Sequence, residues 1–294
     1  MKKRPVLRGF LILGVVLGLF VVAVIAISLI FRRQAPTPIA FGDRIGVVEV
    51  LGVISDPQET VKWLKTFRED GSIKAIVIRI DSPGGAVGAA QEIYREVLRT
   101  RSRKKVVASL GNVAASGGYY IACGADKVVA NPGTLTGSIG VVMHFASLEE
   151  LFRKLGIKGY VIKSGPYKDV GSPWRGMTSK ERALIQEVID NVHEQFVRAV
   201  AEGRKLPLEK VKEIADGRIL SGEQALQLGL VDRLGSFEDA VELAKDLAGI
   251  KGKVHLVYGR EKPSLLQYLI EGLWKKGWKE ISRGLAGLSY LWYL

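Results

Sequence analysis

From Arg44 onward, the chain alternates between apolar runs rich in β-branched residues and segments in which apolar residues recur with helical spacing. This alternation is typical of an α/β domain with a mainly parallel sheet. In such sheets the functional loops lie beyond the carboxyl ends of the strands. The expected strands are Ile45–Val50, Lys74–Ile80, Lys105–Leu110, Lys127–Ala130, Ile139–Val142 and Val254–Val257. The expected helices between them are Pro57–Glu69, Ala86–Arg101 and Ser147–Leu155.

Polar capping residues mark three helix starts in the second half of the chain. Thr178 and Glu181 have the spacing of a capping box, in which the side chain of each residue accepts a hydrogen bond from the backbone N–H of the other. The helices predicted from these signals run from Thr178 to about Gly203, from Ser221 to near Gly229 and from Ser236 to Leu247.

An uncharged apolar segment precedes the α/β pattern. Phe10–Phe31 has 22 residues, and at ~1.5 Å per residue a helix of this length spans a hydrocarbon core of ~30 Å. The apolar part of a cleavable signal peptide has only about 7–15 residues, so we expect an uncleaved transmembrane anchor. Four basic residues precede the segment and two follow it, which predicts a cytoplasmic N-terminus and an extracytoplasmic body. We therefore expect a basic stub and anchor at 1–33, a linker at 34–43, a folded domain at 44–258 and a tail at 259–294.

The net charge of +13 is concentrated at the two ends of the chain. Residues 1–33 carry six basic residues and no acid, and residues 251–294 carry eight basic residues and three acids. This distribution favours attraction to anionic lipid over a nucleic-acid groove. Cys123 is the one cysteine and is expected to be a small core residue. No Cys/His cluster has zinc spacing, and we expect neither a metal nor a cofactor.

The tail from Leu265 to Leu294 combines aromatic and basic residues, with apolar residues along roughly one helical face. It carries too many charges to span a bilayer readily. Two interpretations remain open, because both predict the same apolar face. The tail either lies in the membrane interface as an amphipathic helix or packs on its own domain or a neighbouring subunit.

Ser116 stands among small residues directly after an expected strand, in the run Ala-Ala-Ser-Gly-Gly-Tyr-Tyr. A serine at a helix start is favoured for nucleophilic chemistry because backbone amides and the helix dipole stabilise negative charge there. The two following glycines allow a substrate to approach the backbone closely. The alternative is a tight strand-to-helix turn in which the serine only caps the helix.

A serine hydroxyl needs a base, and no histidine lies near Ser116 in the sequence. A buried lysine with a lowered pKa can take this role, and the spacing leaves Lys158, Lys163 and Lys168 as candidates. The Ser-Pro-Gly-Gly run at 82–85 follows another strand and could expose amides for an oxyanion hole. Its ordinary alternative is a simple turn.

Five ordered motifs resemble the signal peptide peptidase A family. They are Ser-Pro-Gly-Gly at 82–85, Ser-Gly-Gly-Tyr-Tyr at 116–120, Asn-Pro-Gly-Thr at 131–134 with Thr-Gly-Ser-Ile-Gly-Val at 136–141, Lys-Ser-Gly-x-x-Lys-Asp-x-x-Ser-Pro at 163–173, and the segment Gly217–Asp232. The resemblance covers about Arg44 to Leu247 and implies a Clp protease/crotonase-like fold.

The resemblance also implies an activity and its residues. Ser116 matches the nucleophile, Lys168 the general base, and the amides of Gly85 and Gly117 the oxyanion hole, while Ser172 is expected to hydrogen-bond the lysine. Such enzymes degrade leftover signal peptides at the extracytoplasmic membrane face. We expect a homo-oligomer, an octamer, with the Ser-Lys dyad completed between subunits.

Three other functions remain open. A related membrane Ser-Lys peptidase could act on one specific membrane protein, a crotonase-type enzyme could use the fold on acyl-CoA, and a scaffold could carry a degenerate protease fold. Of the three histidines, His144, His193 and His255, we expect His144 to be the alternative base if a histidine is used.

Overall fold

The computed structural model describes residues 43–260, together with Gly14, residues 18–22 and Val24. Most of the expected anchor at Phe10–Phe31, nearly all of the linker and the tail from 261 lie outside the described residues. Among the residues that are described, no helix is long and apolar enough to cross a membrane. Residues 43–259 belong to one compact unit.

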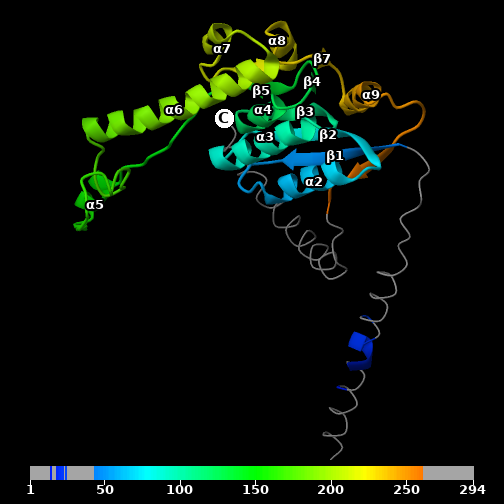
Figure 1. Ribbon diagram of the computed structural model, residues 1–294. Helices are drawn as coiled ribbons and strands as arrows, with labels where there is room; N and C mark the ends of the chain where they lie inside the picture. The colour runs from blue at the N-terminus through cyan, green and yellow to red at the C-terminus, as the bar shows by residue number, and fades with distance from the viewer. Residues whose placement is uncertain (1–13, 15–17, 23, 25–42, 261–294) are drawn as a thin grey trace, which may run out of the picture. The chain divides into compact units, whose positions relative to one another are not determined.

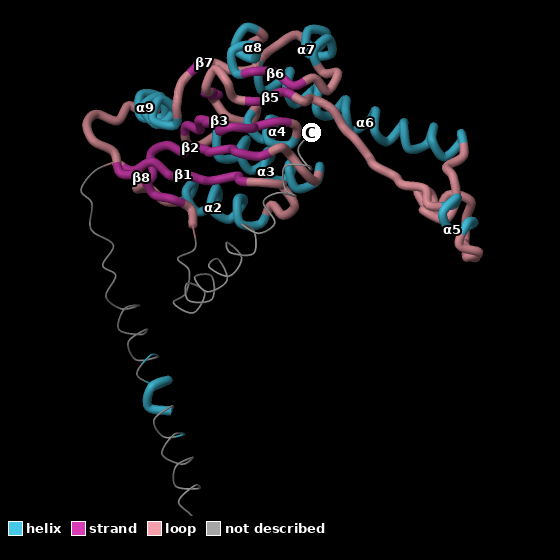
Figure 2. Tube along the Cα trace, turned by 180° about the vertical axis from the view of Figure 1, so that it is seen from behind, coloured by secondary structure: helices cyan, strands magenta, loops and turns pink. Residues whose placement is uncertain are grey.

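Eight strands form one sheet, with the order β6-β5-β3-β2-β1-β8 and with β4 paired to both β3 and β7 (Figure 2). Every pairing is parallel except that of β5 with β6. The predicted mainly parallel α/β sheet is therefore confirmed. The strands are β1 (Arg44–Leu51), β2 (Ile73–Ser82), β3 (Lys105–Ala115), β4 (Lys127–Ala130), β5 (Leu135–Gly137), β6 (Ile219–Ser221), β7 (Arg233–Leu234) and β8 (His255–Tyr258).

Helices cover both faces of the sheet, which explains why its central strands are apolar on both sides. In β2, Ile76 and Ile78 pack into one core with α2, α3 and α4, whereas Ala75 and Val77 pack into a second core with α9. Cys123 is buried in the first core, as predicted, and burial raises the pKa of its thiol to about 12. The helices are α2 (Gln58–Glu69), α3 (Val87–Arg101), α4 (Gly117–Ala122), α5 (Glu149–Lys154), α6 (Ser179–Arg204), α7 (Leu208–Ile214), α8 (Gly222–Gln227) and α9 (Phe237–Leu247).

One predicted strand is wrong. The segment expected as a strand at Ile139–Val142 is irregular, and the strand forms earlier, as β5. The reason is local, because Gly137 and Ser138 both have positive φ, 74° and 49°, and such residues end a strand. The capping boxes at Thr178, Ser221 and Ser236 are all present, with both hydrogen bonds in each. The predictions from these caps are therefore confirmed.

A projecting arm leaves the sheet between β5 and the middle of α6 (Figure 1). We define the arm as residues 142–191, which include α5 and the N-terminal half of α6. Helix α6 has 26 residues, or about 39 Å at ~1.5 Å per residue. Its C-terminal half packs into the core through Phe196, Val197, Ala199 and Val200. The arm contributes most of the large apolar side chains that are exposed within residues 43–260.

Candidate active site

Ser116 lies in the turn between β3 and α4. Its backbone has φ 51° and ψ −121°, a conformation that is rare outside glycine and costs of order 1–3 kcal/mol. Backbone bonds hold this turn in place, because the Ser116 N–H donates to the Gly137 carbonyl at 2.9 Å and the Tyr120 N–H donates to the Ser116 carbonyl at 2.8 Å. The Ser116 hydroxyl makes no capping bond to α4. The interpretation as an ordinary helix cap is therefore wrong.

The glycine turn after β2 packs directly against Ser116. A Cβ at Gly84 would lie 2.8 Å from the Gly117 nitrogen and 2.9 Å from the Ser116 Cβ. The φ of Gly84 is also +103°, which disfavours any other residue. Glycine is therefore required at this position for two independent reasons, the close approach of two chain segments and the backbone conformation.

The amides of Gly85 and Gly117 are both available at this contact. Ile54 donates its N–H to the Gly84 carbonyl at 2.9 Å and accepts from the Ala86 N–H at 2.7 Å, as in a parallel bridge. This pairing turns the N–H of Gly85 away from Ile54, and a Cβ at Gly117 would lie 3.4 Å from the Gly85 nitrogen. Within the described residues neither amide donates to a backbone acceptor. Two neighbouring N–H groups beside a serine are what an oxyanion hole requires.

An apolar pocket opens on one side of Ser116. The ring of Tyr120 forms part of its wall and is held by Tyr94 and Phe196, each with a ring centroid 4.9 Å away. Such a pocket suits an apolar side chain of a bound peptide. The remaining lining residues are Gly85, Val87, Ala90, Gln91, Gly117, Gly140, Val141 and Val192.

A second, more polar pocket also borders Ser116. Asp190 and His193, both from α6, line it, and the Nε2 atom of His193 is buried with no hydrogen-bond partner among the residues that the structure describes. His144, the histidine expected as the alternative base, instead lines a pocket on the arm with Ser172. His193 is therefore the histidine nearest to the nucleophile, and the sequence missed it because only the packing of α6 brings it there.

Lys168 is exposed on the arm, in the segment that connects α5 to the start of α6. Figures 1 and 2 both show α5 and the start of α6 at the end of the arm that lies away from α4. Val192 beside Ser116 is 13 residues from Ser179 along α6, which corresponds to about 20 Å. A single copy of the chain therefore does not bring Lys168 and Ser116 together.

Among the three lysine candidates, the contacts of Lys163 argue against it as the base. Lys163 donates to Asp169 at 2.6 Å and to the Pro166 carbonyl at 3.1 Å, so its ammonium group is already engaged. Ser172 accepts from the Trp174 N–H at 3.3 Å. No hydrogen bond joins Ser172 to Lys168 among the residues that the structure describes, and the supporting role expected for Ser172 stays a prediction.

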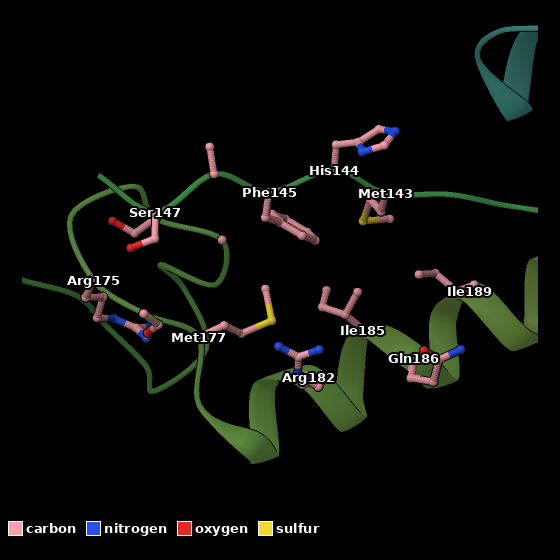
Figure 3. A pocket seen from close by; sticks show the side chains of 14 residues that line it. Met143, His144, Phe145, Ser147, Arg175, Met177, Arg182, Ile185, Gln186 and Ile189 are labelled. Carbon is pink, nitrogen blue, oxygen red and sulfur yellow. The ribbon is translucent and has the colours of Figure 1, made fainter. Parts of the chain in front are cut away.

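Arg175 forms an ion-pair cluster next to Lys168. Its guanidinium donates to both carboxylate oxygens of Asp169, at 2.8 and 3.0 Å, and to both of Glu181, at 2.5 and 2.8 Å. Hydrogen bonds from Arg175 hold the pKa of Asp169 well below its usual value and lower that of Glu181 to about 2. Figure 3 shows the pocket on the arm that His144 and Ser172 line, with Arg175 and Ser147 at one end and Ile189 at the other. Sequence reasoning missed this cluster, since its members resemble ordinary surface charges.

The part of the chain that contains Ser116 matches two protein-family models. The model of peptidase family S49 matches residues 99–251. This chain belongs to peptidase family S49. The Clp protease model matches residues 55–135, in agreement with the mostly parallel sheet. The two matches overlap at 99–135, the stretch that contains Ser116 and Gly117, while Gly85 lies in the Clp protease match and Lys168 in the S49 match.

Individual S49-like proteins agree with this assignment. The chain is 50% identical over 209 residues to "Putative protease slr0021" of Synechocystis sp. The aligned region covers 70% of this chain and 75% of the relative. The chain is 37% identical to "Putative signal peptide peptidase SppA" of Enterococcus faecium, over 70% of this chain and 64% of the relative. It is 34% identical to "Serine protease SPPA, chloroplastic" of Arabidopsis thaliana, over 77% of this chain but 35% of the relative. The chain is thus a serine peptidase of the S49 family.

Proposed function

We propose that this chain is a membrane-anchored serine endopeptidase that degrades cleaved signal peptides, with Ser116 as nucleophile and Lys168 as general base. The observation that carries the proposal is the turn at Ser116. Here a serine with a strained backbone, whose hydroxyl makes no capping bond to α4, lies beside the amides of Gly85 and Gly117. Backbone strain of this kind clusters at active sites.

The geometry supports an acyl-enzyme mechanism. The neutral amine of Lys168 takes the Ser116 proton while the serine oxygen attacks the peptide carbonyl carbon. The negative carbonyl oxygen is stabilised by the N–H groups of Gly85 and Gly117. As the carbon–nitrogen bond breaks, the Lys168 ammonium donates its proton to the leaving amine. Lys168 then takes a proton from water as the water oxygen attacks the ester carbon. It returns that proton to the Ser116 oxygen as the ester bond breaks, which releases the acid product and restores the neutral amine.

The dyad must form between two copies of the chain in this proposal. Lys168 lies on the arm ahead of Ser179, where α6 begins about 20 Å from Val192 of the Ser116 pocket, so the lysine of one copy would serve the serine of another. Exposed apolar side chains on the arm support such a contact, since Tyr160 is 87% exposed and Ile162 is fully exposed. Burial against a neighbour would also favour the neutral amine. We propose a homo-oligomer, an octameric ring.

The substrate and the membrane location are proposed on separate grounds. The apolar pocket beside Ser116 suits the apolar core of a signal peptide, and one relative is named as a signal peptide peptidase. The apolar segment Phe10–Phe31 and its flanking charges support a single anchor with the N-terminus in the cytoplasm and the body outside it. The basic, aromatic tail is proposed to contact the same membrane or another subunit.

Subunit complementation tests the shared dyad. The full chain is prepared in detergent as Ser116→Ala, as Lys168→Ala and as a co-assembled equal mixture, and hydrolysis of a fluorogenic apolar peptide is measured. Each variant alone should be inactive. The mixture should regain about a quarter of wild-type activity, because one site in four then pairs a native serine with a native lysine from the next copy.

Three outcomes of this experiment contradict parts of the proposal. A mixture that stays inactive while it assembles normally would place both residues of the dyad in one chain. An active Lys168→Ala variant would remove Lys168 as the base, and His193 would be the next residue to test. An active Ser116→Ala variant would overturn the assignment of the nucleophile itself.

A further inference from the structure

The ion-pair cluster on the arm joins the Lys168 segment to the start of α6. Asp169, the residue directly after Lys168, shares the guanidinium of Arg175 with Glu181. Glu181 is 3% exposed and also accepts from the backbone N–H and the hydroxyl of Thr178, at 2.9 Å each. It is therefore the N3 residue of the capping box of α6, whose N-cap is Thr178, and Arg175 ties the backbone next to Lys168 to this helix end.

The same helix also reaches the nucleophile. The C-terminal half of α6 supplies Val192 and Phe196 to the apolar pocket beside Ser116. One helix thus carries the Lys168 segment at its beginning and borders the serine at its other half. A segment fixed to the start of α6 has a defined position relative to the body, as a base that serves a neighbouring copy needs.

The charges in the cluster give Arg175 a second effect. Two carboxylates, Asp169 and Glu181, are balanced by Arg175 and by Lys163, which bonds Asp169 at 2.6 Å. Without Arg175, Asp169 would keep Lys163 on Oδ1 but would lose the partner of Oδ2, and that oxygen would attract the ammonium of the adjacent Lys168. A lysine paired with a carboxylate favours its charged form and is a poorer base. The other titratable groups around the cluster are Glu149, which accepts from the Gly176 N–H at 2.7 Å, and His144 and Arg182, which line the same pocket.

We propose that Arg175 is a positioning residue for this peptidase: it fixes the Lys168 segment to α6 and keeps Asp169 from pairing with Lys168. The inference rests on the proposed role of Lys168 as general base. Arg175 itself touches neither the substrate nor the reacting atoms.

The test compares Arg175→Gln with a matched control on the same arm. Arg153 forms an exposed pair with Glu150 at 3.1 Å, with side chains 74% and 77% exposed, so Arg153→Gln removes the same charge without touching the cluster. For each full-length protein, kcat, KM and the pH profile of kcat/KM are measured on a fluorogenic apolar peptide, and assembly is checked by size. Arg175→Gln should lower kcat at least about tenfold with KM changed less than about twofold. Its acid limb should move to higher pH, because that limb reports the base.

A double variant separates positioning from general damage to the fold. Adding Asp169→Asn to Arg175→Gln removes the carboxylate whose Oδ2 has lost its Arg175 partner, so the acid limb should return toward the wild-type position while kcat stays low. A loss of folded protein would lower the apparent kcat without moving the acid limb of the pH profile. If Arg175→Gln fails to assemble, Arg175→Lys decides by the same readouts, with an intermediate kcat expected because lysine lacks the two-sided fork.

The outcomes also distinguish this inference from the proposed function. Wild-type kcat and an unmoved acid limb in Arg175→Gln, with Lys168→Ala inactive, would overturn the role of Arg175 and leave the dyad intact. The same would follow if Arg153→Gln produced an equal loss. An active Lys168→Ala variant would remove the proposed base, and with it the positioning role.

Discussion

The body around Ser116 and the arm around Lys168 are built in different ways. Ser116 is held by backbone bonds and by glycines in close contact, within a fold whose core strands and helices are buried. Lys168 is exposed, and the segment around it is held by the side-chain charges of Asp169, Arg175 and Glu181. The nucleophile is thus fixed by the fold itself, whereas the base depends on a cluster of ion pairs and, in our proposal, on a second copy.

The two halves of the site should therefore respond differently to mutation. A group fixed by backbone geometry tolerates almost no added atom, because the backbone cannot move without disturbing the sheet. A group fixed by side-chain charges depends on pH and on its partners. Changes in the body should therefore abolish activity or stability outright, and changes in the arm should act on assembly, kcat and pH dependence.

The largest expected effect is at Ser116. Ser116→Ala should lower kcat by at least about 10³-fold, because it removes the nucleophile. Ser116→Gly should be equally inactive yet more stable to heat, since glycine adopts φ 51° without the strain that serine carries. Peptide hydrolysis and thermal unfolding of the same samples check both parts. Ser138, also at positive φ, supplies the control variant Ser138→Ala, which should keep most activity.

The second effect compares a glycine of the body with a glycine of the arm. Gly84→Ala places a methyl group 2.8 Å from the Gly117 nitrogen at a φ of +103°, so it should lower kcat by about 10²-fold through the displaced amides. Gly165→Ala on the arm meets no atom within 4 Å and should leave kcat unchanged. Equal kcat values for the two variants, measured on assembled protein, would contradict the tight contact at Ser116.

The third effect compares the two halves of α6. Phe196 is 4% exposed and packs against Tyr120, so Phe196→Ala should lower the free energy of unfolding by about 3–5 kcal/mol. Leu184 is 38% exposed on the arm, and Leu184→Ala should change it by less than about 0.5 kcal/mol while weakening assembly. Denaturant unfolding and sedimentation measure the two properties. If Leu184→Ala lowered the free energy of unfolding but assembled normally, this side chain would stabilise the fold of its own chain and not the contact between copies.

Most of the body could be predicted from the sequence, since the signals are local. The apolar run in β2 and the capping box at Thr178 and Glu181 specify their own elements. The two-residue strand β7 and the short β6 were not predicted, because only tertiary pairing defines strands of this length. The strand expected at Ile139–Val142 is absent because Gly137 and Ser138 have positive φ angles that end the preceding strand. The sequence shows the apolar run at 139–142 clearly but gives only a weak signal for these two backbone angles.

The candidate site could be predicted only where its chemistry follows the chain. The motifs indicated Ser116 and the glycine turn, and the structure brings these segments together. It does not bring Lys168 to Ser116 within one copy, and a sequence cannot show which copy supplies a residue. His193 and Arg175 were missed for a related reason: the packing of α6 and the folding of the arm give these residues their neighbours.

The smallest effect at neutral pH is electrostatic and belongs to the arm alone. Hydrogen bonds from Arg175 and Thr178 lower the pKa of Glu181 from 4.5 to about 2. A carboxyl whose pKa falls on folding stabilises the fold above its unfolded value and loses this contribution as pH drops through the folded value. Amides of residues 163–181 should therefore be protected from hydrogen exchange at pH 5 and above, and lose this protection between pH 4.5 and 2. Glu181→Gln should lack the added protection at pH 5 and show little further change on acidification. An arm in Glu181→Gln that is as protected as the wild type at pH 5 would mean that apolar packing, not the charge cluster, holds the Lys168 segment.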